Sequence, residues 1–339
     1  MSFIFGSAYN LMLSDDYFDN PDVKTYMSIA NADFEDQSLV RRYRVLVPFM
    51  AKTVTLPFES VYSQVWKKRT QSDAPLRLGF LIVNVVFMSL AGLIIFEICN
   101  FYSLNSFLSF AGTMVFLLAG RWGSIISGLP YTDSLYILLI SALWLGVLIK
   151  NTHLILVSVI LGFLAKESFI FFVPLIVLGA SKKNVFKLVF STILGVSLAV
   201  LVRYYVDFKT NTPMFSSVEK DLDHFQVIWL SVLRIFNLRG VGELCTVLGV
   251  FSLINILGVF SLYDKTFRST IFKKLNLSFW LFSLIIWVHA LLSNEVGRML
   301  YIGGAAWTVF MVLTVQHHSW FRHIHQFIEK YNFKELSRN

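Results

Sequence analysis

The chain has 339 residues, of which 56% are hydrophobic and 15% are charged, and its formal net charge is +8. A soluble domain carries about 25% charged residues, so this composition excludes an ordinary soluble protein and predicts a chain built for lipid. The expected partner is therefore the lipid bilayer. Nucleic acid is not an expected partner, because the sequence contains no basic soluble module with interleaved aromatic residues.

An apolar stretch, 1–13, precedes a long and mostly polar segment, 14–77. About 20 apolar residues are needed to cross a bilayer, so the first stretch predicts part of a span. Within 14–77, Asp22 and Tyr26 lie one turn apart if the segment is helical, and they then share a face. This pattern has two interpretations: the acidic residues cap and solubilise a surface helix, or they carry chemistry.

Three arginines, Arg41, Arg42 and Arg44, come just before an apolar segment that contains Pro48. This pattern is typical of a helix that lies at the membrane interface. Guanidinium groups bind phosphate in a bidentate manner, so a phosphate site is one interpretation. Attraction to anionic lipid headgroups without specificity is the other.

Seven further apolar stretches are long enough to cross, or nearly cross, a membrane: 78–99, 104–120, 131–149, 185–206, 241–263, 277–293 and 298–315. Two shorter stretches, 153–165 and 168–181, are separated by Lys166-Glu167 and predict broken or re-entrant helices around a polar break. The sequence therefore predicts an all-α polytopic membrane protein with about 9–10 transmembrane or partial helices.

Basic residues indicate how the chain is threaded, because cytoplasmic loops of membrane proteins carry an excess of Lys and Arg. One set of connections is rich in them: Lys150, Lys182, Lys183, Lys187, Lys265, Arg268, Lys273 and Lys274. We expect this side, and the C-terminus with it, to be cytoplasmic and 14–77 to be an extracytoplasmic loop with amphipathic helices. The chain then divides into one membrane domain, 1–315, and a basic cytoplasmic tail, 316–339. We expect an integral membrane protein with several passes.

Three short polar motifs then fall on the extracytoplasmic side. In the first, Tyr131-Thr132-Asp133, capping of the next helix explains the threonine and the aspartate without a function. In the second, Lys166 and Glu167 either neutralise each other or hold the lysine where it meets a lipid phosphate.

The third polar motif is a tight turn in which Glu295 precedes Arg298. Arg298 stands at the start of a helix, where an anion would be favoured. His289, one span earlier, is interpreted as a hydrogen-bonded residue of the helix bundle.

Taken in chain order, these motifs resemble the polytopic glycosyltransferases of the GT-C superfamily, closest to small bacterial mannosyltransferase-like and uncharacterised members. The likeness spans roughly 15–300 and depends on five short patterns. They are Asp-x-x-x-Tyr-x-x-Ile-Ala from Asp22, Tyr-Arg-x-Leu-x-Pro from Tyr43, Pro-Tyr-Thr-Asp-Ser-Leu-Tyr from Pro130, Lys-Glu-Ser from Lys166 and Gly-Arg from Gly297.

The resemblance implies a transferase that moves a sugar from a polyprenyl-phosphate donor to an envelope lipid, glycan or protein acceptor outside the cytoplasm. An acidic residue in the first outside loop serves as the base in such enzymes, which implies Asp22, with Asp15 or Asp16 as the fallback. The expected catalytic residues are Asp22, Asp16 and Asp133. The residues expected to bind the donor phosphate are Arg41, Arg44, Lys166 and Arg298. The residues expected to line the substrate site are Tyr26, Tyr131, Glu167 and Glu295.

The chain departs from this family at its start, where a complete span is usual and only about 13 apolar residues precede Asp15. We therefore expect either that the first helix is partial or truncated, or that activity needs a partner subunit. Three other functions are compatible with the same pattern: a transporter or flippase for lipid-linked saccharides, a polysaccharide polymerase, and a non-catalytic assembly subunit.

The sequence requires no cofactor. Cys99 and Cys245 lie in apolar stretches without a Cys-x-x-Cys or Cys/His spacing, so we interpret both as small buried hydrophobic residues. A divalent metal that bridges Asp22 and a phosphate is compatible with the sequence, but no ligand spacing demands one, and no metal ligands are predicted.

Overall fold

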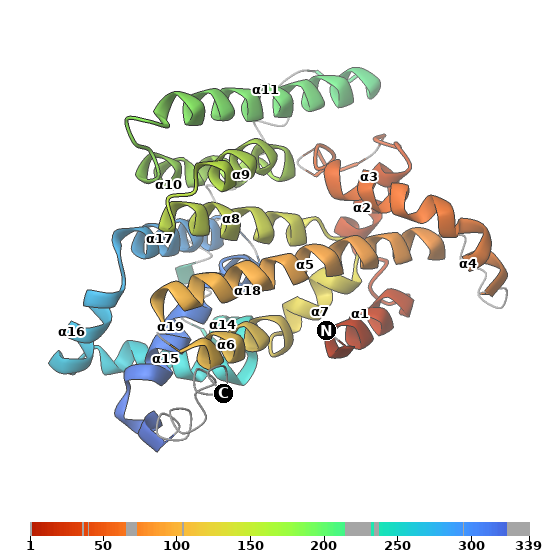
Figure 1. Cartoon of the computed structure of the whole chain (residues 1–339). Coiled ribbons are helices and arrows are strands. Elements are labelled where there is room, and N and C mark those ends of the chain that lie inside the picture. Colours follow the sequence, from red (N-terminus) through yellow and green to blue (C-terminus); the bar gives the residue numbers. More distant parts are fainter. Residues whose placement is uncertain are drawn as a thin grey trace, which may run out of the picture.

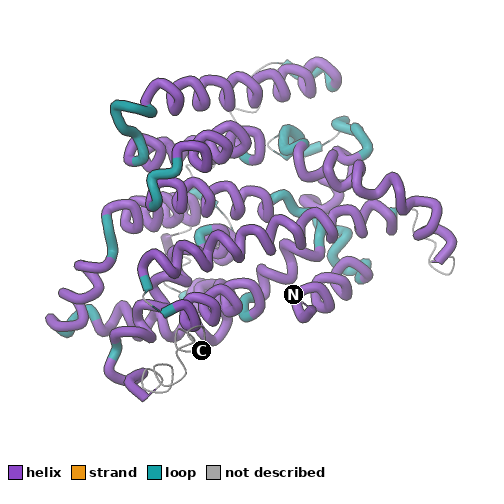
Figure 2. Tube along the Cα trace, viewed as in Figure 1, coloured by secondary structure: helices purple, strands orange, loops and turns teal. Residues whose placement is uncertain are grey.

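The computed structural model describes residues 2–35, 37–39, 41–65, 73–103, 105–213, 232–233, 237–293 and 295–323. Every regular element in this part of the chain is a helix (Figures 1 and 2). The prediction of an all-α protein is confirmed to that extent. Of the expected basic tail, 324–339 lies outside the described residues.

The helices follow one another along the chain in three groups. The N-terminal third contains α1 (Ser2–Leu13), α2 (Pro21–Ala30), α3 (Leu46–Thr55), η1 (Leu56–Phe58), α4 (Glu59–Val65) and α5 (Ala74–Tyr102). The middle contains α6 (Ser106–Leu118), α7 (Arg121–Gly128), α8 (Asp133–Leu148), α9 (Thr152–Ala165), η2 (Glu167–Phe172), α10 (Val173–Leu178) and α11 (Val185–Lys209). The remainder contains α14 (Leu238–Leu248), η4 (Gly249–Phe251), α15 (Ser252–Ser261), α16 (Lys265–Lys274), α17 (Leu277–Leu291), α18 (Val296–Ile302), α19 (Gly304–His317) and η5 (Ser319–Phe321).

The apolar stretches of the sequence are largely helical where the structure describes them, and the candidate spans fall into three classes. Three helices are long and apolar enough to cross a membrane: Ala74–Tyr102, Val185–Lys209 and Gly240–Ser261. Three pairs qualify only together and are bent at a short break, by 62° between α6 and α7, 95° between α16 and α17, and 74° between α18 and α19. Three shorter apolar helices are Asp133–Leu148, Thr152–Ala165 and Glu167–Leu178. By length and composition the described residues therefore form three to six possible spans, as a multi-pass membrane protein requires.

Local sequence explains where the helices next to the polar motifs begin and end. Pro21 is the first residue of α2, and the Asn20 side chain caps that helix by accepting a hydrogen bond from the backbone N–H of Asp22 at 2.9 Å. Lys166 is extended, with φ −160° and ψ 132°, so α9 ends before it and a 3₁₀ helix begins after it. The predicted break between two short helices is therefore present at Lys166-Glu167.

Two groups of connections lie at opposite ends of the helix bundle (Figure 1). The α8–α9 connection, the α10–α11 connection and α16 lie at one end, on the left of the view, whereas α2 and α3 lie toward the other. The first end carries the lysines and arginines that the sequence assigns to the cytoplasmic side. The second end carries the extracytoplasmic motifs, so the chain separates these two sets in space.

The N-terminal segment packs against the long helices of the bundle. Val23 and Tyr26 of α2 are fully buried in one apolar cluster with Phe80 of α5 and Leu135 of α8. Burying one apolar side chain of this size contributes roughly 1.5–3 kcal/mol to the free energy of folding, so α2 has a fixed position on the bundle. This packing is what places Asp22.

The first helix, α1, packs on α7 and α5, and its contact with α7 depends on a glycine. A Cβ atom on Gly128 would lie 2.4 Å from the carbonyl oxygen of Ala8, which is backbone and cannot rotate away. Ala8 is itself fully buried. The close approach of α1 and α7 therefore needs glycine at this position.

We expect Gly128→Ala to lower the free energy of unfolding by about 1–3 kcal/mol, because an added methyl group must push α1 away from α7. Thermal unfolding of the detergent-solubilised protein measures this. The matched control is Gly6→Ala in α1, where an added Cβ meets nothing within 4 Å. Equal unfolding midpoints for Gly128→Ala and the wild type would contradict the expectation.

Candidate functional site

The centre of the site is the buried carboxylate of Asp133, the first residue of α8. It accepts hydrogen bonds from two cations: Lys166 Nζ lies 3.1 Å from Oδ1, and Arg298 Nε lies 2.7 Å from Oδ2. Thr132, which occupies the N-cap position, makes no side-chain capping bond. Capping therefore does not account for this motif, because its aspartate is committed to an ion-pair network.

Arg298 connects Asp133 to a second carboxylate, that of Asp22. Its Nη1 lies 3.0 Å from Asp22 Oδ2 and 2.7 Å from Glu295 Oε2. Its guanidinium also lies over the ring of Tyr131, 4.2 Å from the centroid, which favours the cation further. One arginine from α18 therefore joins residues from α2, from the loop before α8 and from α8 itself.

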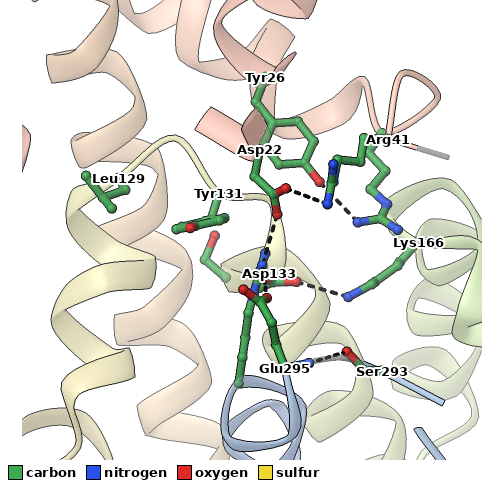
Figure 3. Close-up of polar contacts among 12 residues, drawn as sticks. Asp22, Tyr26, Arg41, Leu129, Tyr131, Asp133, Lys166, Ser293 and Glu295 are labelled. Carbon is green, nitrogen blue, oxygen red and sulfur yellow. Dashed lines mark hydrogen bonds and ion pairs between the residues drawn. The ribbon is translucent and has the colours of Figure 1, made fainter. Parts of the chain in front are cut away.

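Asp22 bonds on its other oxygen with Arg41, whose Nη2 lies 2.6 Å from Oδ1 (Figure 3). The Arg41 side chain is about one-third exposed (35%), whereas that of Arg298 is almost completely buried. Asp22 thus has a buried guanidinium on one side and a more accessible one on the other.

Arg44 and Glu167 form a second ion pair beside the first network. Two guanidinium nitrogens of Arg44 donate to the two carboxylate oxygens of Glu167, and Nη1 donates to the Tyr26 hydroxyl at 3.0 Å. Lys166 and Glu167, although adjacent in sequence, bond with different partners. The interpretation that these neighbours neutralise each other is therefore wrong, and the extended backbone at Lys166 is the reason, since it directs the two side chains apart.

The described cluster holds equal numbers of opposite charges. Its four cations are Arg41, Arg44, Lys166 and Arg298, and its four carboxylates are those of Asp22, Asp133, Glu167 and Glu295. Buried ions are tolerated only when they are paired and hydrogen-bonded, so the pairing explains how the cluster can exist among apolar helices. It also means that an arriving anion shares cations that already have partners.

Burial and neighbouring charges shift the pKa of two loop residues in the cluster. Burial raises the pKa of the Tyr131 hydroxyl above its usual range, against the opposite effect of Arg298, so this hydroxyl stays protonated near neutral pH. Burial disfavours the charge on Arg44, but Glu167 and Tyr26 outweigh it and raise the pKa of Arg44 well above its usual range. Arg44 is therefore a permanent cation.

A cavity of about 260 Å³ opens beside the cluster, between α9, η2, α11 and the segment that contains Arg44. Its charged lining residues are three cations, Arg44, Lys166 and Arg203, and two carboxylates, those of Glu167 and Asp207. Its apolar walls are formed by Phe163, Leu164, Ile170, Val196, Ala199 and Val200. This arrangement fits a ligand with an anionic group and an apolar chain, because each part meets a surface of matching polarity.

The structure brings together ten of the eleven residues that the sequence proposes for the site. They are Asp22, Tyr26, Arg41, Arg44, Tyr131, Asp133, Lys166, Glu167, Glu295 and Arg298. Asp16 lies apart: it is exposed and accepts a hydrogen bond from Ser14. Its neighbour Asp15 pairs with Arg77, which also bonds with Asp73. The two fallback positions for the base are therefore outside the cluster.

Three residues that border the site are not among the catalytic, phosphate-binding and substrate-lining residues expected from the sequence: Arg42, which was considered only as one of three neighbouring arginines, Tyr43 and Asp207. Asp207 is buried near the end of α11 and accepts hydrogen bonds from Arg42 and Tyr43. The signal was an acidic residue within the last turn of a long apolar helix, where charge is costly and usually paired.

His289 of α17 also differs from its interpretation as a hydrogen-bonded residue. Within the described part of the chain neither ring nitrogen has a hydrogen-bond partner. Its ring packs edge-on against Tyr136 and Phe171 and tilted against Phe172, at centroid distances of 5.2–6.3 Å. It thus packs as one ring of an aromatic group with Tyr136, Phe171 and Phe172.

Comparison with known proteins gives no assignment: no family model matches the chain, and no curated protein and no solved structure is similar to it. Among the described residues, no group of three or more His, Cys, Asp or Glu side chains could hold a metal ion. The function therefore has to be inferred from the cluster and the cavity.

We expect Arg298→Gln to lower the free energy of unfolding by about 3–5 kcal/mol, because it leaves the buried carboxylates of Asp133 and Asp22 without their shared cation. Thermal unfolding in detergent measures the loss. Asp16→Asn is the control, because an exposed residue outside the cluster should change stability by no more than about 0.5 kcal/mol. Similar unfolding midpoints for the two variants would show that the network does not hold the helices together.

Proposed function

We propose that this chain is an integral membrane glycosyltransferase that moves a sugar from a polyprenyl-phosphate donor to an envelope lipid, glycan or protein acceptor on the extracytoplasmic side. The observation that carries the proposal is the position of Asp22. It is buried and pairs with both Arg298 and the partly exposed Arg41, in a charge cluster of which Arg44, Lys166 and Glu167 also line the apolar-walled cavity. In the proposal Asp22 serves as the base, Arg44 and Lys166 as the phosphate-binding cations, and the apolar walls of the cavity as the lipid-binding surface.

The cavity supports a lipid-linked donor. Its apolar walls come from α9 and from α11, a long helix of which much of the surface is exposed and apolar, as expected of a lipid-facing helix. An isoprenoid chain can lie against these walls while its phosphate meets Arg44 and Lys166. Lys166 donates one hydrogen bond, to Asp133, and an ammonium group has three N–H donors, so it can bind a phosphate oxygen as well.

In the proposed reaction the acceptor hydroxyl oxygen forms a bond to C1 of the sugar as the bond from C1 to the phosphate oxygen breaks. Asp22 takes the hydroxyl proton. The leaving polyprenyl phosphate keeps the bonding electrons, and Arg44 and Lys166 stabilise the charge that develops on it. Arg298 holds Asp22 in place by bonding with its buried oxygen, while the displacement of Arg41 frees the other oxygen for the acceptor.

The orientation of the chain supports chemistry outside the cytoplasm. The basic connections lie at the end of the bundle opposite α2 and α3 (Figure 1). By the excess of Lys and Arg in cytoplasmic loops, that end is cytoplasmic and the cluster is extracytoplasmic. We propose the bacterial inner membrane as the location and the cytoplasm for the C-terminus.

We expect Asp22→Asn to lower kcat by about 100-fold or more, because an amide cannot take the acceptor proton. Turnover is measured in vesicles loaded with polyprenyl-phosphate sugar, where unused donor should accumulate. Asp16→Asn, an exposed acid on the same segment, should turn over as the wild type does. Undiminished turnover in Asp22→Asn would remove this residue from the mechanism, and movement of labelled lipid across vesicles that lack an acceptor would indicate a transporter.

We expect Ala199→Trp to weaken binding of polyprenyl phosphate at least about tenfold, because the indole fills the apolar part of the cavity; this corresponds to about 1.4 kcal/mol. Native mass spectrometry or a fluorescent polyprenyl phosphate measures the affinity. The matched control is Ser197→Trp, two residues earlier on α11, whose side chain is exposed and does not line the cavity. Equal affinities for the two variants would place the lipid elsewhere.

A further inference from the structure

Asp207 is an unexpected residue near the end of a membrane-spanning helix. It is 7% exposed, in the last turn of α11, and its Oδ1 accepts hydrogen bonds from the guanidinium of Arg42 and from the Tyr43 hydroxyl, the latter at 2.6 Å. Burying a carboxylate at such a position is costly unless cations and hydroxyl groups surround it. Two segments therefore supply this contact: Asp207 comes from α11, and Arg42 and Tyr43 come from the segment before α3.

The turn after α11 completes this contact. Arg42 Nη1 donates to the Thr212 hydroxyl at 3.1 Å, and the hydroxyl groups of Thr210 and Thr212 lie 2.8 Å apart. One turn before Asp207, the guanidinium of Arg203 lies over the Tyr43 ring, 4.8 Å from its centroid. The end of α11 and the turn after it thus contact Arg42 and Tyr43 through hydrogen bonds and through the stacking of Arg203 on the Tyr43 ring.

Four consecutive residues, 41–44, are fixed by three different elements. Arg41 bonds with Asp22 of α2, Arg42 and Tyr43 bond with Asp207 of α11, and Arg44 bonds with Glu167 of η2. The residues on either side of the Asp207 contact are those that touch the proposed base and the proposed phosphate site. A shift of the middle of this segment therefore moves both.

The segment also forms one wall of the cavity, which is lined by Tyr43, Arg44 and Asp207 together. Among the described helices α11 packs chiefly on α9, so the Asp207 contact is its second attachment to the protein. Figure 1 shows α11 as the outermost helix of the bundle beside α9. The cavity is thus bounded by a helix that this contact holds in place.

We propose that Asp207 is a positioning residue: through Arg42 and Tyr43 it sets the positions of Arg41 and Arg44, and with them the affinity of the cavity for the phosphate of a lipid-linked substrate. This inference rests on the proposed function for its ligand, but not for its geometry. Asp207 itself has no role in the bond-making step.

The test compares Asp207→Asn with Asp207→Glu, which keeps the charge. We expect Asp207→Asn to weaken binding of polyprenyl phosphate at least about tenfold and to raise KM for the donor by a similar factor, with a smaller change in kcat. Asp207→Glu should recover most of the affinity. Arg42→Lys, which keeps the charge but loses the planar fork, should shift the affinity in the same direction as Asp207→Asn. Asp264→Asn, in the cap of α16 at the opposite end, is the control.

Hydrogen exchange of the backbone amides in 41–47 gives a readout that needs no turnover. It should rise at least about tenfold in Asp207→Asn and stay near the wild-type rate in Asp207→Glu. If affinity and exchange in Asp207→Asn match the wild type, the positioning role is overturned. If no variant or wild-type protein transfers sugar but exchange and lipid-phosphate binding still respond to Asp207→Asn, the positioning role stands and the glycosyltransferase proposal fails.

Discussion

The guanidinium of Arg298 bonds with both Asp22 and Asp133, and the rest of the site depends on this interaction. The first pair joins residues 276 positions apart in the chain, and the second joins residues 165 apart. An unpaired buried charge costs several kcal/mol, and without Arg298 the carboxylate of Asp22 would retain only Arg41 and that of Asp133 only Lys166. The pairings therefore constrain α2, α8 and α18 to meet at one place, and the adjoining pairs of Lys166 and Arg44 extend that constraint to η2 and the 41–44 segment.

Much of the helical layout could be predicted from the sequence, because hydropathy alone defines an apolar stretch long enough to form a helix in lipid. Most of the cluster could be predicted as well, since ionisable residues near hydrocarbon are rare and usually functional. Pairing could not be predicted. Lys166 and Glu167 are adjacent in sequence, but the extended backbone at Lys166 directs their side chains to different partners. The pattern around Asp133 is typical of a helix cap, and only the folded chain places Arg298 and Lys166 beside it.

The environments of Asp207 and His289 could not be predicted from the sequence, and the physical reason is the same for both. Asp207 lies near the end of an apolar helix and would be exposed at a membrane surface if nothing covered it; only the folded chain brings Arg42 and Tyr43 onto it. His289 is the converse case, because a polar residue among apolar ones suggests a hydrogen bond, whereas three aromatic rings enclose it. In both cases the environment comes from segments far away in the chain, which local patterns do not encode.

The long separation between Asp22 and its buried arginine has a consequence for biogenesis. A ribosome delivers the N-terminal segment to the membrane first, and domains generally fold from that end. The buried partner of Asp22 is therefore present only after α18 has been inserted. Among the described helices, only α19 and η5 follow α18. The candidate site is therefore completed only when α18 has been inserted. A nascent chain that stalls earlier contains the ion pairs of Arg41, Arg44 and Lys166 in its sequence but lacks the arginine that joins Asp22 to Asp133.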